Sequence, residues 1–329
     1  MAVFRVRTVG SLLSGLFLVL LIACSPETTD LEFQNDEVGG VLRALLSGQE
    51  IFSYQYGSRL DLPHYWPLKS PTGRNMLVQQ TEPYPHHRSF WFADTIRFQG
   101  EGARDVSTYN ALYSGREVGE NHFEPPFEDH VRHLAFRRID TSASGGTLIA
   151  DLVWEMDGDR PILDETRHVD VHDLGEGEYL LDLTFTLTAS YGSVEFVSDD
   201  VHYAWPYLRL QTRFSGENGG VICSDSGAKG QEATNMQVAL WIDYSNTLDG
   251  TTEGVAVFQW PDGQDHRWLT REYGCFGPRR PDARSGLPFV LGHGESLTQR
   301  VGVLVHRGDV ESGHVAERYQ AYISGRWQE

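Results

Sequence analysis

The stretch that decides the fold runs from Glu178 to Ser190 and reads Glu-Tyr-Leu-Leu-Asp-Leu-Thr-Phe-Thr-Leu-Thr-Ala-Ser. Apolar and polar side chains alternate along most of it, and it is rich in threonine, leucine and aromatic residues. A period of two with such residues is typical of a β-strand that buries one face. The stretch therefore predicts a strand with one side in the core and the other toward solvent.

The same alternation recurs along the chain, with turn-forming residues between the alternating segments. Val41 to Gly57 predicts a hairpin that turns near Ser47-Gly48. The other predicted strands are Thr147–Met156, Ser193–Ser198, Tyr207–Phe214, Met236–Asp243, Gly254–Trp260, Trp268–Tyr273 and Leu297–His306. Only Asp309 to Ser324 carries apolar residues near helical spacing, with Asp309 as the expected N-cap.

These elements predict an all-β fold, a single large antiparallel β-sandwich that ends in a short C-terminal helix. No repeat, low-complexity tract or interdomain linker interrupts residues 39–329. We therefore expect one domain over that range.

The N-terminus has the features of a lipoprotein signal peptide over residues 1–23. Arg5 and Arg7 precede a short apolar run that stops at Leu21-Ile-Ala-Cys24. The run is too short and wrongly flanked for a membrane-spanning helix. We expect lipidation of Cys24, followed by a flexible tether over residues 24–38. Ser25 stands where an aspartate would indicate retention in the inner membrane, so the expected location is the outer membrane of the cell envelope.

The charge balance excludes one class of partner. The chain has 46 acidic residues against 27 lysines and arginines, a net charge of −19. Removing residues 1–23 takes away Arg5 and Arg7 and no acid, which moves the net charge from −19 to −21. Nucleic acid requires a basic face, so we expect no nucleic-acid partner. An anionic substrate would have to be met by arginines concentrated in one place.

The cysteines leave two possibilities open. Cys24 is assigned to the lipid, which leaves Cys223 and Cys275. These two could form a disulfide in an oxidising compartment, or they could be two buried thiols. No CxxC or zinc-type spacing occurs.

The stretch richest in chemistry is Thr81-Glu-Pro-Tyr-Pro-His-His-Arg-Ser-Phe-Trp-Phe-Ala93. His86 and His87 are suited to proton transfer near neutral pH, and Arg88 offers a fixed fork of donors to a carboxylate. If the segment is extended, His86 and Arg88 share one face and His87 points to the other. The alternative interpretation is a buried strand with a hydrogen-bonded histidine pair.

Three blocks together carry a family resemblance. They are Tyr65-Trp-Pro-Leu68, Pro85-His-His-Arg88 and Trp268-Leu-Thr-Arg-Glu-Tyr-Gly274. In this order the chain resembles the PmoA-like family of secreted bacterial proteins over nearly its whole mature length. The family label borrows the name of a methane-oxygenase subunit that is an integral membrane protein. This chain differs from that subunit, since its sequence has no spanning segment after the signal peptide.

The resemblance implies a galactose-mutarotase-like sandwich that accompanies carbohydrate-degrading systems. Relatives of this kind have been linked to removing water from terminal uronic acids of oligosaccharides. Members often carry an acid directly before the proline-histidine-histidine, where this chain has Pro83-Tyr84. A proton relay through that acid is therefore not expected here unless Glu82 replaces it.

Uronate elimination requires a cation for the carboxylate, a base for the adjacent C–H and an acid for the leaving oxygen. We predict His87 as base, Tyr273 as acid and His86 as a further proton-transfer residue. The predicted substrate-binding residues are Arg88, Arg271, Arg213, Trp91, His202 and Trp205. His86, His87, Arg88, Arg271 and Tyr273 are expected to converge on one pocket.

The alternative for each arginine is a structural salt bridge. Arg167 fits that alternative best, because Glu165 would share its strand face.

Other functions remain open from the sequence. A non-catalytic sugar-binding lipoprotein needs the arginines and tryptophans but no base. A mutarotase-like epimerase needs only an acid and a base, and a glycosidase needs two well-separated carboxylates. A metal site could combine His130 and His133 with His86 or His87, but the expectation is no metal and no cofactor. The oligomeric state is left undetermined.

Overall fold

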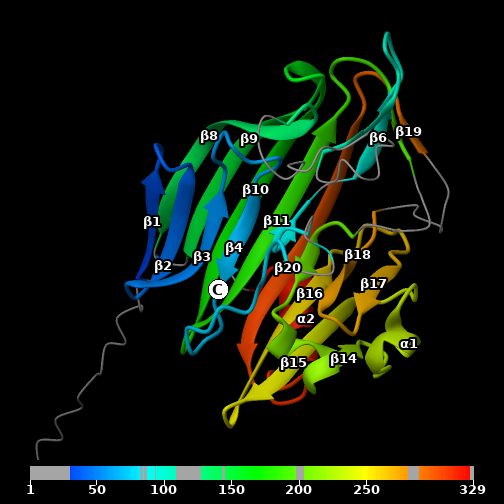
Figure 1. The fold of residues 1–329 in the computed structure, drawn as a ribbon. Helices are drawn as coiled ribbons and strands as arrows, with labels where there is room; N and C mark the ends of the chain where they lie inside the picture. Colours follow the sequence, from blue (N-terminus) through cyan, green and yellow to red (C-terminus); the bar gives the residue numbers. More distant parts are fainter. Residues whose placement is uncertain are drawn as a thin grey trace, which may run out of the picture.

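The computed structural model describes residues 30–81, 84, 87–92, 94–108, 127–142, 145–197, 204–280 and 289–326. The predicted signal peptide and Cys24 lie outside these residues. Within them the chain is built mainly from antiparallel strands in three sheets, with two short α-helices (Figure 1). The predicted all-β class, with a helix near the C-terminal end, is confirmed.

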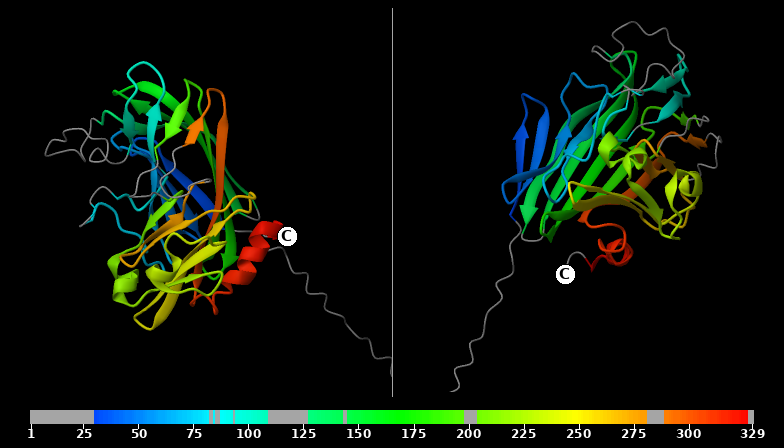
Figure 2. Two further views of the ribbon diagram at one scale, coloured as in Figure 1. Left: turned by 90° about the vertical axis from the view of Figure 1, so that its right-hand side faces the viewer. Right: turned by 60° about the horizontal axis from the view of Figure 1, so that its bottom comes forward.

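Two large sheets form the sandwich. The first has the order β1 (Leu31–Asp36), β2 (Val41–Leu46), β3 (Gln49–Gln55), β4 (His64–Leu68), β5 (Phe90–Trp91), β13 (Tyr207–Arg209), β18 (Cys275–Pro278) and β17 (Trp268–Arg271). The second has the order β14 (Val221–Ser224), β15 (Trp241–Leu248), β16 (Thr251–Gln259), β20 (Ser296–Arg307), β11 (Glu178–Thr188), β10 (Arg160–Gly175), β9 (Gly145–Met156) and β8 (His130–Ser142). Figure 2 shows the two sheets as facing layers.

A third, smaller sheet lies at one end of the sandwich. Its order is β19 (Phe289–Leu291), β12 (Val194–Phe196), β6 (Thr95–Phe98) and β7 (Asp105–Ser107). The remaining elements are the 3-10 turns η1 (Thr212–Phe214) and η2 (Gly216–Asn218) and the helices α1 (Gly230–Thr234) and α2 (Val315–Ser324). Neither helix is long and apolar enough to cross a bilayer.

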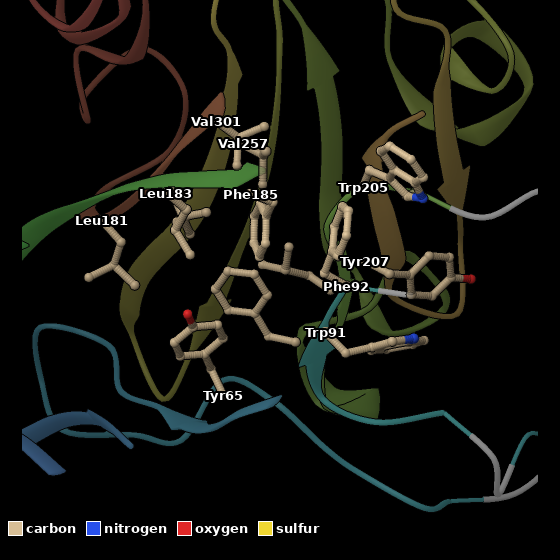
Figure 3. Packing of buried hydrophobic residues seen from close by; sticks show 14 of the residues in the cluster. Tyr65, Trp91, Phe92, Leu181, Leu183, Phe185, Trp205, Tyr207, Val257 and Val301 are labelled. Carbon is tan, nitrogen blue, oxygen red and sulfur yellow. The ribbon is translucent and has the colours of Figure 1, made fainter. Parts of the chain in front are cut away.

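The core forms because β11 turns every second side chain toward the first sheet. Leu181, Leu183 and Phe185 are buried, and Figure 3 shows them opposite aromatic residues of the first sheet. The Phe185 ring stacks on Phe92 with centroids 4.4 Å apart. Burying one such side chain stabilises the fold by about 1.5–3 kcal/mol. The alternation along 178–190 is therefore the pattern that closes the sandwich.

The predicted C-terminal helix exists but begins later than expected. Asp309 does not cap it, because its carboxylate accepts the Ser312 N–H at 2.9 Å in a separate turn. His314 then adopts a left-handed conformation, with φ of 52°, and the helix starts at Val315. Tyr319 and Tyr322 of α2 pack on Phe258, covering a second hydrophobic cluster on the outer side of the second sheet.

Two other boundaries need correction. The predicted tether, residues 24–38, includes β1, because Leu31 is buried and the strand pairs with β2 along its whole length. The strand predicted at Met236–Asp243 begins only at Trp241, since Met236 has a positive φ of 62° and ends the turn after α1.

Two long strands, β8 and β10, are absent from the predicted strands. β10 spans Arg160–Gly175 and turns Glu165 and Arg167 into the core, so charged residues occupy positions where the alternation would require apolar ones.

One edge of the second sheet is β8, which pairs with β9 and with no other strand of the described residues. Its 13 residues shift register twice, between His133 and Ala135 and again between Phe136 and Arg138. Each shift is a bulge that breaks the regular ladder of the strand.

Candidate functional site

The candidate site lies on the side of the first sheet that faces away from the second. Phe92 points inward to Phe185, so Trp91 points to the opposite side of the sheet. On β13, Tyr207 pairs with Trp91 of β5 and Arg209 pairs with Cys275 of β18. Alternation along β13 thus places Tyr207 and Arg209 on the same outward side.

The outward-facing residues of these strands and three others form a group that we call the His87 cluster. Its members are Tyr84, His87, Trp91, Tyr207, Arg209, Tyr273 and Cys275. Figure 3 shows Trp91 and Tyr207 side by side, turned away from the core residues Phe185 and Leu183.

His87 is enclosed by aromatic rings. Its imidazole stacks on Tyr84, with centroids 5.0 Å apart and an interplanar angle of 19°. Trp91 and Tyr207 each lie 5.4 Å from it. The side chain is buried, and Nδ1 lies 3.7 Å from the sulfur of Cys275. A histidine held in this way has a fixed ring plane and a sheltered position.

Arg209 is the unusual charge in the cluster. It is 3% exposed, and its guanidinium lies 4.4 Å from the centre of the Tyr273 ring. Nη1 donates a hydrogen bond to the sulfur of Cys275 at 3.5 Å, and Nε has no hydrogen-bond partner within the described part of the chain. Among the described residues, no carboxylate lies within ion-pair distance of Arg209. A buried cation normally requires an anionic partner.

Tyr273 is held in place by a braced turn between β17 and β18. Glu272 accepts the Gln231 N–H of α1 at 2.9 Å, and the Gln231 side chain accepts the Glu272 N–H at 2.9 Å. Tyr244 donates its hydroxyl to the Glu272 carbonyl at 2.9 Å. Gly274 has a φ of 99°, which favours glycine and lets the chain turn back into β18.

Burial controls the ionisation of the phenols and the thiol. It raises the pKa of Tyr273, and the neighbouring Cys275 raises it further. Burial also raises the pKa of Tyr207. The pKa of the Cys275 thiol is raised by burial, although Arg209 acts to lower it. Both tyrosines and the thiol therefore keep their protons at neutral pH, and Tyr273 is suited to donate one.

The structure brings the predicted site residues His87, Tyr273 and Trp91 together, although they come from segments far apart in the chain. The ring of Tyr84 links His87 to Tyr273, at 5.0 Å from the first and 5.2 Å from the second. His86 and His202, also predicted for the site, lie outside the described residues.

Arg88 does not join the cluster. It turns to the other side of the chain and donates from Nη2 and Nε to Asp61, at 2.6 and 2.9 Å. Both partners are buried, so Arg88 forms a structural salt bridge and is not a substrate-binding residue in this structure. Arg167 does the same, as expected, with Nη2 2.7 Å from Glu165 on its own strand.

The other predicted substrate-binding residues lie at varied distances from the cluster. Arg271 is half-buried beside Tyr273 and donates from Nη1 to Asn235 at 2.7 Å. The charge of Arg271 acts to lower the pKa of the Tyr273 hydroxyl, against the larger effect of burial. Arg213 is exposed on η1. Trp205 is buried in the core between Phe92 and Phe196, so its ring is not available to a sugar in this structure.

His130 and His133 both lie on the strand β8. His130 contacts Glu155 at 2.9 Å, whereas His133 packs among Tyr54, Tyr56 and Phe136. Burial and the charge of Arg167 lower the pKa of His133 to about 4. In the part of the chain that the structure describes, no three potential ligands gather in a way that would hold a metal.

Cys223 and Cys275 are both free and buried. Of the two possibilities left open by the sequence, the structure has the unpaired thiols. Cys223 lies on β14, in the second sheet, while Cys275 lies at the centre of the His87 cluster.

Four cluster residues were missed as site residues by reasoning from sequence: Tyr84, Tyr207, Arg209 and Cys275. The signal for two of them was the Tyr207-x-Arg209 spacing, which puts a phenol and a guanidinium on one strand face directly after Trp205-Pro206. The identity of their partners depends on strand pairing, which that spacing does not contain.

The comparison with solved structures finds remote likenesses. The chain is similar to the GH36 α-galactosidase AgaA from Geobacillus stearothermophilus, with 10% identity and a TM-score of 0.45 over 85% of this chain and 41% of that one. It is also similar to a galactose 1-epimerase from Lactobacillus acidophilus NCFM, with 9% identity and a TM-score of 0.38 over 85% of this chain and 99% of that one. The chain thus spans about two fifths of the galactosidase.

A polysaccharide lyase structure matches with 10% identity and a TM-score of 0.32, over 78% of this chain and 32% of that one. Likenesses of this size assign no activity to the chain. No curated protein matches its sequence. The PmoA-like label remains a resemblance. A family model described as a family of unknown function, DUF6807, matches residues 42–320, and the chain belongs to this family.

Proposed function

We propose that the protein is a carbohydrate-active enzyme that removes water from an acidic sugar or oligosaccharide by acid–base chemistry. The observation that carries the proposal is Arg209, a buried guanidinium with no carboxylate partner among the described residues. Keeping such a charge out of water is costly unless an anion binds beside it. The carboxylate of a uronic acid is an anion of the required kind.

The groups next to Arg209 match the proton transfers of an elimination. His87 takes the proton from the carbon next to the substrate carboxylate, and the charge of Arg209 stabilises the electron density that builds up there. The carbon–oxygen bond then breaks as Tyr273 protonates the leaving hydroxyl. The products are water and an unsaturated uronate, and no oxidant or reductant is needed.

The remaining parts of the site support a sugar ligand. Tyr84 and Tyr273 are partly exposed and lie 5.2 Å apart, so their rings offer apolar surface for the faces of a sugar. Arg271, half-buried beside Tyr273, supplies a second cation close to the substrate. The raised pKa of Tyr273, caused first by burial, keeps its hydroxyl protonated and ready to act as the acid.

The test is incubation of the purified protein with uronate-containing oligosaccharides. We expect ultraviolet absorbance from a conjugated unsaturated uronate, together with the mass loss of one water. His87→Ala should slow the reaction on the order of a hundred-fold or more. Arg137→Met, which changes an exposed arginine on β8, is the matched control and should leave the rate unchanged. No turnover on any uronate would refute the proposed reaction.

A second candidate is a non-catalytic sugar-binding protein. The tight enclosure of His87 and Trp91, both buried, favours it because a base must reach its substrate. Tight sugar binding without turnover, and with an affinity unchanged by His87→Ala, would support this candidate. Interconversion of anomers without loss of water would instead support a mutarotase.

We also propose that the protein is a lipoprotein of the cell envelope, anchored through Cys24. The support is the Leu21-Ile-Ala-Cys24 sequence after a basic start and a short apolar run. Cys24→Ser should release the protein from membrane fractions. If the variant remains membrane-bound to the same extent, the anchor is elsewhere.

A further inference from the structure

The elimination proposed above gives no role to the thiol of the His87 cluster. Cys275 lies at the centre of the cluster and is fully buried. Its sulfur is 3.7 Å from Nδ1 of His87 and accepts a hydrogen bond from Nη1 of Arg209 at 3.5 Å. Tyr207 and Tyr273 also interact with the thiol. Cys275 therefore connects the base, the acid and the cation of the site.

We propose that Cys275 is the positioning residue of His87: its sulfur accepts a hydrogen bond from Nδ1–H and so holds the imidazole in the tautomer whose Nε2 carries the lone pair. A neutral imidazole has one donor and one acceptor nitrogen, and the partner of one nitrogen decides the state of the other. The choice of His87 as the base rests on the proposed function, whereas the tautomer does not.

The 3.7 Å contact between the sulfur and Nδ1 fits either direction of the hydrogen bond, and the proposal makes the sulfur the acceptor. Arg209 has only donors, so its contact with Cys275 already uses the sulfur as an acceptor. Among the described residues, the charged and titratable groups that contact this pair are Arg209, Tyr84, Tyr207 and Tyr273, and none of them is a carboxylate. The thiol keeps its proton at neutral pH, because burial raises its pKa.

A thiol at this position has an effect that a carboxylate would not have. An aspartate between His87 and Arg209 would orient the imidazole equally well, but it would form an ion pair with Arg209 and cancel its charge. The neutral sulfur orients His87 and leaves the positive charge of Arg209 available to a substrate anion. Cys275 thus links the orientation of the base to the binding of the carboxylate.

The tautomer can be measured without a substrate. Nitrogen-15 NMR of imidazole-labelled protein, with the His87 signals assigned through His87→Gln, should show Nδ1 protonated and Nε2 unprotonated near neutral pH. Cys275→Ala should shift His87 toward the Nε2–H tautomer, and Cys275→Ser, which keeps an acceptor, should restore the original one. Nε2–H in the unaltered protein would overturn the proposal, as would identical His87 spectra for all three proteins.

Turnover of an acidic oligosaccharide separates this inference from the proposed function. Cys275→Ala should lower kcat on the order of ten- to a hundred-fold with little change in KM, and Cys275→Ser should recover most of the loss. Cys275→Asp should instead raise KM, because the aspartate pairs with Arg209. The expected NMR result without turnover would leave the positioning role standing and refute the function. Turnover that is equal in the alanine and serine variants would overturn the positioning role alone.

Discussion

Arg88 and Arg209 lie on adjacent segments, since the Arg209 N–H donates to the carbonyl of Ser89 at 2.7 Å, yet their surroundings differ in one respect. Both side chains are buried, at 5% and 3% exposure. Arg88 has a buried aspartate as its partner, whereas Arg209 has a thiol. Arg167 and Arg280 resemble Arg88, because each forms an ion pair with a buried carboxylate, Glu165 and Asp94 respectively. Burial alone does not separate a structural arginine from one that is available to a ligand; the partner does.

The largest expected effect comes from breaking the paired arginine. Arg88→Met should lower the free energy of unfolding by about 3–5 kcal/mol, because it leaves Asp61 buried without its cation. Urea denaturation measures the loss. The double variant Arg88→Met with Asp61→Leu should recover most of the stability, since it removes both charges. If the double variant is as unstable as the single one, the pair is not the source of the effect.

Substitution of Arg209 should instead change turnover and leave stability nearly unchanged. Arg209→Met removes no ion pair found in the described residues, so the midpoint of urea unfolding should change little. Turnover of an acidic oligosaccharide should fall about a hundred- to a thousand-fold, as when a group that stabilises transition-state charge is removed. A large loss of stability with unchanged turnover would reverse the assignment of the two arginines.

A smaller effect concerns the neighbourhood of Arg88. Burial, and next the charge of Arg88, lower the pKa of His64 to about 3. In the unfolded chain this imidazole takes up a proton near its ordinary pKa of about 6.5, while the folded protein keeps it neutral. Stability is therefore present above that value and is lost as the pH falls toward 3, by about 2 kcal/mol at pH 5.

The His64 effect can be isolated by substitution. His64→Gln keeps a polar side chain beside Gln79 but removes the titrating ring. Urea unfolding at pH 7 and pH 5 should show a smaller loss for the variant than for the unaltered protein. Equal losses would mean that His64 is protonated in the folded state.

The smallest effect is expected at Trp205. Its indole is buried between Phe92 and Phe196, and its Nε1 has no hydrogen-bond partner among the residues that the structure describes. Trp205→Phe should cost about 1 kcal/mol of stability, because the lost packing is partly offset by removing an unsatisfied donor. Denaturation measures this change. The sugar-binding role predicted from the sequence requires instead a loss of affinity, which a titration with oligosaccharide would detect.

The sequence predicts the fold where burial follows hydrophobicity. β11 and the β2–β3 hairpin were located because their alternation reports which side faces the core. The extent of β10 was not located, although Glu165 and Arg167 were expected to share a strand face, because their inward-facing ion pair puts charge where the pattern requires an apolar residue. The start of α2 was misplaced because Asp309 accepts the Ser312 N–H in a local turn that precedes the helix. The preference for aspartate at an N-cap does not distinguish a helix start from such a turn.

The site was predictable only in part, for a related reason. His87 and Tyr273 belong to stretches rich in chemical side chains, and the sequence shows this directly. The roles of Arg88 and Arg209 depend on partners 27 and 66 residues away in the chain. Those contacts come from the order of strands in the first sheet, which no local spacing encodes.

The two register shifts of β8 have a consequence for how molecules of this protein coexist when crowded. A straight, open strand of 13 residues would offer its free backbone groups to the same strand of another molecule, and sheets could then grow from chain to chain. The bulges at His133 and Phe136 interrupt that row of groups, and the exposed, ion-paired arginines Arg132, Arg137 and Arg138 cover the edge with polar side chains. The irregular strand thus acts as a barrier to aggregation, and this matters most at high protein concentration.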